Sequence, residues 1–425
     1  MTEEFIYFVW QNKLFDLENL KTSNNQKIIV QSTGFRNSDE GPDFVNCKIL
    51  IDDIQWVGAV EVHINSSDWN KHNHHTNVFY NSVVLQIVVN NDVEVFNQAR
   101  QSVPTAVLHY DKLYYERFMN IIQSKNDIHC GNFLKEVDRI YLKSWFNRLV
   151  IERFEKKSQE FLRIYNETLK SFEETFYRLL CKNFGQKVNS LPFELLAESL
   201  PYKYIAKQKD NLLQIEAMMF GQAGMLGNLD IEEEYISLLK REYTFLKQKY
   251  QLKPIDANLW KYMRMRPQAF PTIRLSILSA FFYKNQNPFE KFIEIESTKQ
   301  IREMFDVSVS DYWNTHFRFG KYTKSTIKRL GNETIDNIIV NTVCVSIFCY
   351  GIIKNNDNFK EKSIELLSSL KSEKNSIIRQ FGAFGVEAKN ALESQAMIEL
   401  RNEYCLKNRC LKCSIGGKII IRKKM

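Results

Sequence analysis

Short apolar runs rich in valine and isoleucine follow one another along the first 110 residues. They are separated by Asn, Asp and Gly, a pattern typical of strands joined by turns. A helical apolar face formed by residues 5–10 precedes them. The pattern predicts a mixed α/β domain with one helix near the start and strands at 28–32, 44–51, 54–64, 82–90, 93–96 and 105–110.

From about residue 133 the apolar period becomes helical, as in Phe146, Leu149, Val150 and Phe154. The same spacing continues through helices expected at 212–220 and 235–250, while 124–132 has the composition of a linker. A chain of 425 residues is long for a single core. We therefore expect an α+β protein, with a mixed-sheet domain over 1–130 followed by a large all-helical domain over 131–425.

Two features bear on where the chain resides. The start, MTEEFIYF, carries acids in place of a basic signal-peptide region, so we expect a cytoplasmic protein. The apolar segment 335–353 is interrupted by polar residues such as Asp336 and Asn341, which favours a buried helix over a membrane span. We expect no membrane association.

The charge is divided unevenly along the chain. Residues 1–130 hold 10 Lys and Arg against 16 Asp and Glu, a net charge of −6, whereas 131–425 hold 48 against 34, a net charge of +14. A basic body beside an acidic domain fits a polyanionic partner such as nucleic acid. A solvated lysine-rich surface would give the same count.

Two carboxylates are expected to meet at the end of one hairpin. Asp52 and Asp53 can turn the chain between the strands at 44–51 and 54–64. A two-residue turn pairs position 44 with 61, and a four-residue turn moves the partner of 61 to about 46. Either register brings Asp43 beside Glu61, where both could bind one divalent cation. His63 lies on the same strand face as Glu61, because side chains alternate.

Asp43 after Pro42, and Glu61-Val62-His63 eighteen residues on, resemble the PD-(D/E)xK nuclease superfamily. The resemblance implies that Asp43, Glu61 and the Val62 carbonyl hold Mg²⁺ or Mn²⁺, and that Asp43, Glu61 and His63 are catalytic. His63 stands where that pattern has lysine. Histidine can bind a softer divalent ion or act as a base, but it lacks a permanent positive charge, which puts retention of catalysis in doubt.

Four of the seven histidines fall between 63 and 75, in the stretch that ends with SSDWNKHNHH. His63, His72 and His74 could form a zinc site as neutral imidazoles. Alternatively Asp68, His72 and His74 contact the phosphate or hold the carboxylate site together. The stretch could also be a short helix capped by Ser66 or Ser67, with exposed histidines beyond it.

Cys405, Cys410 and Cys413 form a C-x4-C-x2-C cluster, which Cys130 could complete. Four thiolates suit Zn²⁺ or an iron–sulfur cluster, and they leave no open position for a reaction. Some nucleases of the PD-(D/E)xK superfamily hold such a cluster with one distant and three C-terminal cysteines, at other spacings. The alternative is reduced structural thiols, which a cytosolic address would also explain.

Basic residues interleaved with aromatic ones mark two segments, 259–274 and 318–331. Arginine forks and aromatic faces suit phosphates and exposed bases, although solvated or salt-bridged cations beside core aromatics would look the same. The candidate contacts with nucleic acid are Arg264, Arg266, Arg274, Arg318, Lys321, Lys324, Lys328 and Arg329.

Several stretches spread nearly end to end resemble a bacterial family catalogued as domain of unknown function 2851. They are GPDF, VEVHINSSDWNKHNHH, RMRPQAFPTIR, KRLG and YCLKNRCLKCSIG. This resemblance implies family membership and no activity. The resemblance to the PD-(D/E)xK superfamily, together with the basic second part of the chain, favours a metal-dependent nuclease acting on DNA or RNA. The alternatives are an inactive nucleic-acid-binding or scaffold protein and a zinc hydrolase with another substrate.

Overall fold

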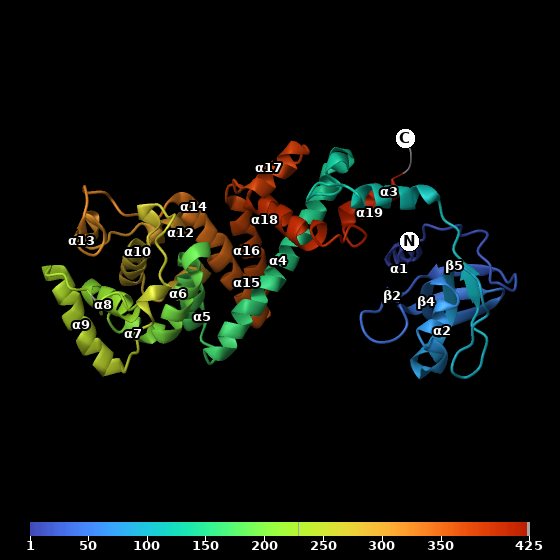
Figure 1. Ribbon diagram of the computed structural model, residues 1–425, viewed down its shortest axis with the longest axis horizontal. Coiled ribbons are helices and arrows are strands. Elements are labelled where there is room, and N and C mark those ends of the chain that lie inside the picture. The colour runs from blue at the N-terminus through green and yellow to red at the C-terminus, as the bar shows by residue number, and fades with distance from the viewer. Residues whose placement is uncertain (228, 423–425) are drawn as a thin grey trace. The chain divides into compact units, whose positions relative to one another are not determined.

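The computed structural model describes residues 1–227 and 229–422, and it divides into two compact units (Figure 1). Unit 1 consists of residues 1–145 and 380–386 together with the C-terminal segment from residue 400. Unit 2 consists of residues 146–379 and 387–399. The expected α+β class is confirmed, with a mixed-sheet unit followed by a helical one. The C-terminal segment, which the sequence assigned to the helical domain, belongs to unit 1.

The sheet of unit 1 runs in the order β1-β3-β4-β5-β6, with β2 also paired to β3. Its strands are β1 (Ile28–Ser32), β2 (Phe35–Arg36), β3 (Phe44–Ile51), β4 (Ile54–Asn65), β5 (Val83–Asn90) and β6 (Thr105–Val107). The pairs that involve β3 are antiparallel, whereas β4-β5 and β5-β6 are parallel. Helix α1 (Glu3–Gln11) buries every residue from Phe5 to Trp10 and packs against β4.

The strand expected at 93–96 is not formed, and only an isolated bridge joins Phe96 to Ser102. The reason lies at the start of this segment. Ser66 Oγ accepts the Val93 N–H at 2.9 Å and donates to Asp92 Oδ1 at 2.8 Å. These side-chain bonds replace the ladder that a strand would need.

The β3-β4 hairpin has the two-residue turn expected at Asp52 and Asp53, with Ile51 opposite Ile54. A bulge between Phe44 and Cys47 then shifts the register by one residue. Asn46 adopts a left-handed conformation there (φ 57°), which asparagine tolerates better than most residues. Phe44 therefore pairs with Val60, and Asp43 arrives beside Glu61.

Unit 1 also contains short helices around the sheet and at the C-terminus. They are α2 (Asp68–Lys71), α3 (Lys112–Ile122) and α19 (Ser414–Ile421), with one turn of 3-10 helix at His74–Thr76. Helix α19 packs against α3, and the Arg117 side chain donates to the Ile420 carbonyl at 3.0 Å. These contacts hold the C-terminal segment in unit 1.

Unit 2 is a helical array with one small two-stranded sheet, so the expectation of an all-helical domain was too simple. Its helices are α4 (Arg139–Glu167), which starts in unit 1, α5 (Phe172–Phe184), α6 (Gln186–Ser199), α7 (Tyr202–Ala206), α8 (Leu212–Gln222), α9 (Glu234–Tyr250), α10 (Pro271–Lys284), α11 (Pro288–Glu294), α12 (Thr298–Phe305), α13 (Asp311–Asn314), α14 (Asn332–Ile338), α15 (Cys344–Ile353), α16 (Asp357–Ser369), α17 (Ser376–Ala383) and α18 (Ala391–Glu399). The small sheet pairs β7 (His316–Arg318) with β8 (Lys321–Tyr322).

Helices α14 and α15 run into one another through Ile339–Val343. Within the described residues, Asn332–Ile353 is the one helix long and apolar enough to cross a membrane, and 72% of its most apolar window is buried inside the protein. The expected buried helix at 335–353 is confirmed.

Candidate metal centre beside the central hairpin

A buried acid, Glu61, and a half-buried one, Asp43, meet where β3 begins. The Asp43 amide donates to Glu61 Oε2 at 2.9 Å, and the Val62 amide donates to Asp43 Oδ2 at 3.0 Å. The Tyr7 hydroxyl of α1 also hydrogen-bonds to Asp43. Glu61 is 5% exposed. The hairpin therefore brings Asp43 and Glu61 together as the sequence predicted, and backbone amides hold one oxygen of each.

The surroundings of these acids oppose their ionisation. Burial and the charge of Glu61 raise the pKa of Asp43 to about 6. Burial raises the pKa of Glu61 to about 8. Neighbouring carboxyl groups in a site closed to water need a proton or a cation between them.

A third acid, Glu3, joins this site from the first turn of α1. Burial and the charge of Asp43 raise its pKa, and His72 and His74 act in the opposite direction. The sequence analysis missed Glu3. An acid in the first turn of a helix is common for dipole reasons alone, so only the packing of α1 on β4 reveals its neighbours.

Two histidines face the remaining oxygen of Glu61, and a third histidine lies beside them. Glu61 Oε1 lies 3.2 Å from His74 Nε2 and 3.6 Å from His63 Nε2. One ring nitrogen each from His63, His72 and His74 lies within 4.8 Å of the other two. The Nε2 atoms of His63 and His74 are buried and have no hydrogen-bond partner among the described residues, whereas His72 is exposed.

Both buried imidazoles are neutral at neutral pH. Burial and repulsion by His74 and His72 lower the pKa of His63 to about 3, and burial lowers the pKa of His74 to about 4. A neutral imidazole is the form that binds a metal ion. Their unpartnered nitrogen atoms fit a cation at this position.

The loop after β4 is fixed by side chains that differ from the cap the sequence suggested. Asp68 Oδ2 accepts the Asn65 amide at 2.9 Å, and Asp68 Oδ1 pairs with Lys71 Nζ at 2.6 Å. Asp68 thus supports the loop. Asn73 is left-handed (φ 61°) and turns the chain between His72 and His74. Both rings thereby reach the same side of the loop.

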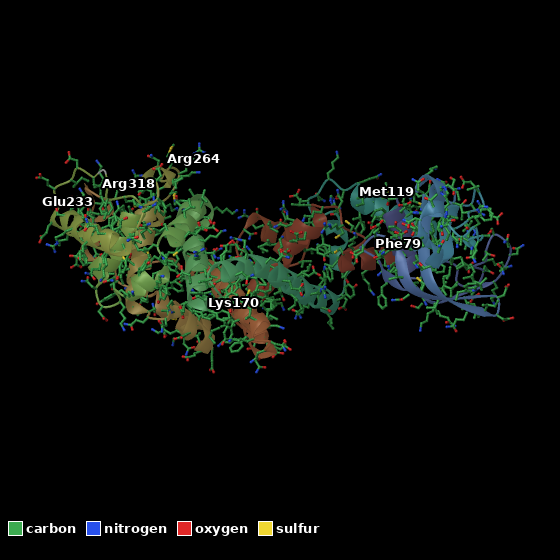
Figure 2. The ribbon with its side chains drawn as sticks, turned by 90° about the horizontal axis from the view of Figure 1, so that it is seen from below. Phe79, Met119, Lys170, Glu233, Arg264 and Arg318 are labelled. Atoms are coloured by element: carbon green, nitrogen blue, oxygen red, sulfur yellow. The ribbon has the colours of Figure 1, made fainter. Side chains whose placement is uncertain are left out.

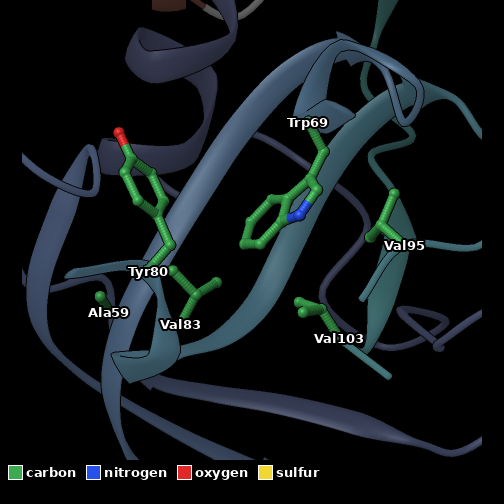
Figure 3. Close-up of a cluster of buried hydrophobic side chains, with 6 residues drawn as sticks. All are labelled: Ala59, Trp69, Tyr80, Val83, Val95 and Val103. Carbon is green, nitrogen blue, oxygen red and sulfur yellow. The ribbon is translucent and has the colours of Figure 1, made fainter. Parts of the chain in front are cut away.

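A buried hydrophobic cluster packs against His74, and Figure 3 shows the side chains of this cluster. It consists of Ala59, Trp69, Tyr80, Val83, Val95 and Val103. The Tyr80 ring stacks on His74 with centroids 3.7 Å apart, and the Trp69 ring meets His74 edge-on at 5.4 Å. The Trp69 indole donates to the Phe96 carbonyl at 2.9 Å, which fixes its ring. His74 is therefore held by packing.

The four cysteines that were predicted to form one site come together in unit 1. In the sequence they are far from the histidines. Cys130, Cys405, Cys410 and Cys413 are all buried and line one small closed cavity of about 10 Å³ with His129 and Tyr404. Burial and the neighbouring Cys413 raise the pKa of Cys410 to about 12. Four thiols around one small cavity fit either Zn²⁺ or an iron–sulfur cluster.

The basic residues chosen from the sequence divide into two sets, all within unit 2. Six are exposed: Arg264, Arg266, Arg318, Lys321, Lys324 and Arg329. Figure 2 labels Arg264 and Arg318 among the side chains of this unit. The Arg318 guanidinium lies over the rings of Tyr262 and Phe270, 4.2 and 4.7 Å from their centroids.

Arg274 and Lys328 are buried instead, 6% and 1% exposed, and do not belong to the exposed set. Lys328 Nζ donates to the Thr326 carbonyl at 3.2 Å and lies over the Phe317 ring at 3.8 Å. Burial lowers the pKa of Arg274 to about 10. The expectation that these two cations meet a phosphate at the surface is wrong, because their neighbours are protein groups.

The fold and the site define an α+β protein whose central hairpin carries a pair of carboxylates, Asp43 and Glu61, next to three histidines. The chain belongs to the family described as a protein of unknown function, DUF2851, whose family model matches residues 3–376. The carboxylates and histidines lie within the matched residues, whereas the three C-terminal cysteines lie beyond residue 376. No curated protein and no solved structure matches the chain.

Proposed function

We propose that this protein is a metal-dependent nuclease whose reaction centre contains Asp43, Glu61 and His63. The observation that carries the proposal is the Glu61 carboxylate, buried between Asp43 on one side and the unpartnered Nε2 atoms of His63 and His74 on the other. Strongly shifted acids and bases grouped beside an exposed edge are typical of reaction centres.

Each side chain has a role that its contacts support. Glu61 directs one free oxygen toward the imidazoles, and Asp43 is held by the Val62 amide and Tyr7. A divalent ion, when bound, would polarise a phosphoryl oxygen and lower the pKa of its water. His63 and His74 are neutral and offer a nitrogen lone pair to an ion or to a proton. The exposed His72 marks the side from which a phosphodiester can enter.

The basic surface of unit 2 supports nucleic acid as the substrate class. Its six exposed cations include Arg318, stacked on aromatic rings, and Lys321, which is next to the 76% exposed Tyr322. Guanidinium groups bind phosphate through two parallel hydrogen bonds, and exposed rings stack on unpaired bases. The excess of positive charge from residue 131 onward acts in the same direction.

A second candidate is a nucleic-acid-binding or scaffold protein that does not cleave. The histidine at position 63 favours it, since a neutral ring there cannot supply the charge of a lysine. Salt-sensitive binding without cleavage in any metal would identify this case. A zinc hydrolase with another substrate would instead bind zinc near His63 and show no affinity for nucleic acid.

The test uses the full chain with single- and double-stranded DNA and RNA in Mg²⁺, Mn²⁺ or Zn²⁺. We expect cleavage that Glu61→Gln and Asp43→Asn each reduce by at least about 100-fold. Asp53→Asn, in the exposed hairpin turn, is the matched control and should cleave like the wild type. An absence of cleavage with every substrate and metal, or equal cleavage by Glu61→Gln and the wild type, would overturn the proposal.

We also propose that the four cysteines hold Zn²⁺ or an iron–sulfur cluster as a structural staple. The support is their burial around one cavity and the distance in sequence between Cys130 and Cys405. Visible absorption of anaerobically purified protein separates the two, since zinc thiolates are colourless.

A further inference from the structure

The carboxylates of this site are less available to an ion than the histidines are. Asp43 Oδ2 accepts the Val62 amide, and Tyr7 also hydrogen-bonds to this side chain. Glu61 Oε2 accepts the Asp43 amide. Glu61 Oε1 accepts from no backbone donor among the described residues, and its near neighbours are the imidazole nitrogens of His74 and His63.

We infer that the resident ion is bound by His63, His72 and His74, with Glu61 Oε1 beside His63 and His74 as an acid that can join them, and that it is a borderline transition-metal ion such as Zn²⁺ in place of Mg²⁺. The inference rests on the proposed function only in that both concern the same site. It replaces the ligand set of Asp43, Glu61 and the Val62 carbonyl implied by the resemblance. Asp43 becomes a residue that positions Glu61.

The donor chemistry decides which ion fits. Imidazole nitrogen suits Zn²⁺, Co²⁺, Ni²⁺ and Fe²⁺, whereas Mg²⁺ prefers six oxygen ligands at short, nearly octahedral distances. Zinc–nitrogen bonds of about 2.0–2.1 Å place neighbouring nitrogen atoms about 3.4 Å apart in a tetrahedron. The three ring nitrogens lie within 4.8 Å of one another, so small side-chain rotations suffice. The exposed His72 leaves the outer side of the ion open to solvent.

Two independent features support a bound ion at this position over a site that is filled by protein side chains alone. Buried polar atoms nearly always have a hydrogen-bond partner, yet the Nε2 atoms of His63 and His74 have none among the described residues. Each ring is also fixed from behind. Tyr80 stacks on His74, and the buried Gln86 side chain contacts His63 Nδ1 at 3.0 Å.

Gln86 selects which nitrogen of His63 is free. Its Nε2 faces His63 Nδ1 at 3.0 Å and the Ser66 carbonyl at 3.3 Å, while its Oε1 accepts from Thr105 Oγ1 at 3.1 Å. In this orientation the ring proton resides on His63 Nε2. Metal binding through Nε2 requires the proton on Nδ1.

A half-turn of the Gln86 amide, whose oxygen and nitrogen have nearly the same shape, places Oε1 opposite Nδ1. Thr105 Oγ1 can then accept from the amide while it donates to the Val103 carbonyl at 3.2 Å. The rotation replaces the hydrogen bond to the Ser66 carbonyl with a contact between two acceptor oxygens, a cost that binding of the ion has to offset. Gln86 is therefore a positioning residue, in the role that outer carboxylates and amides play for metal-binding histidines.

The test measures metal binding directly on the full chain. Protein stripped with a chelator is titrated with Zn²⁺ or Co²⁺, and the loaded protein is examined by X-ray absorption at the metal edge. We expect one ion bound by imidazole nitrogen and oxygen. His72→Ala and His74→Ala should each weaken its binding by at least about 100-fold, and His75→Ala, an exposed neighbour in the same loop, should not.

Gln86 supplies the finer test. Gln86→Leu should weaken binding by about 10-fold, because nothing then orients the His63 ring. Gln86→Glu should bind at least as tightly as the wild type, since a carboxylate can accept only from Nδ1–H. A purely structural role of Gln86 would give equal losses in both variants and would remove this part of the inference.

The cysteine site does not interfere with this measurement. Cobalt bound to thiolate gives charge-transfer bands in the near ultraviolet, which should persist in His72→Ala. The inference is overturned if His72→Ala and His74→Ala bind the metal like the wild type, or if the bound ion has only oxygen or sulfur neighbours. An imidazole-bound ion without cleavage of any nucleic acid leaves the inference standing and removes the proposed function. Cleavage of nucleic acid that is unchanged in His72→Ala would instead leave the proposed function standing and remove the inference.

Discussion

The replacement Glu61→Gln should stabilise the metal-free protein, by an amount that grows with pH. Burial raises the pKa of Glu61 from 4.5 to about 8, so the folded state favours the protonated acid. An acid with a raised folded pKa contributes its full stability below the unfolded pKa. That contribution is lost as the pH rises from 4.5 through 8. Glutamine is neutral throughout and avoids the loss.

The magnitude follows from the two pKa values, at about 1.4 kcal/mol for each pH unit between them. The advantage of the variant over the wild type should be about 1 kcal/mol at pH 5, about 3 kcal/mol at pH 7 and nearly 5 kcal/mol at pH 9. Glu61 is 5% exposed, so solvent screening does not reduce this strongly. The glutamine introduced at this position retains a side-chain oxygen for the Asp43 amide.

The assay is urea or thermal unfolding in the presence of a chelator between pH 5 and 9. Glu18→Gln, at an exposed position of the same unit, is the matched control and should show no such trend. Zn²⁺ at 100 times its dissociation constant should then stabilise the wild type by about 2.7 kcal/mol and the variant by less. A difference between wild type and Glu61→Gln that does not change with pH, or a variant less stable than the wild type at pH 8, would refute the reasoning.

Three further outcomes are expected. Cys405→Ser should release the sulfur-bound metal and lower the melting temperature by at least about 4 °C. Cys47 is a buried cysteine of unit 1 outside the cluster, so Cys47→Ser should keep the metal. Metal analysis and calorimetry of the two variants check both results. Gly58→Ala should lower the free energy of unfolding by about 1–3 kcal/mol, because the new Cβ would lie 2.4 Å from Val84 Cγ1 and 2.6 Å from the Ser82 carbonyl oxygen. Urea unfolding measures this loss, and an unchanged free energy of unfolding would contradict the packing. The double change Lys321→Glu and Lys324→Glu should reduce the slope of log affinity against log salt by about 1.4 to 1.8, and an unchanged slope would exclude these lysines from the interface.

The central hairpin was predictable because two strong local signals agree. Asp52 and Asp53 fix the turn, and the alternation after residue 54 puts Glu61 and His63 on one face. The bulge at Asn46 was not predictable, since it depends on how β3 meets both β1 and β4. The predicted pairing of the two acids is still correct, because a register shift of one residue leaves Asp43 beside Glu61.

The histidines show where sequence reasoning ends. Their density near His63 is visible in the chain, but their convergence depends on the left-handed Asn73 and on Asp92, which accepts from the Ser67 amide at 2.9 Å. Lys328 shows the opposite case, because a run of cations does not reveal that one of them lies over the Phe317 ring inside the protein. Tertiary packing decides both outcomes.

A bound cation accounts for the shifted acids and the shifted imidazoles together. A charged pair of His74 and Glu61 would satisfy both, but burial disfavours the imidazolium and the carboxylate alike. In the neutral pair a protonated Glu61 can donate to His74 Nε2, 3.2 Å from its Oε1, which leaves His63 Nε2 without a partner among the described residues, at about 1–3 kcal/mol. A divalent ion accepts both lone pairs and restores the charge of Glu61 in one step. The metal-free site is thus a set of individually unfavourable groups, which is what a preorganised metal site requires.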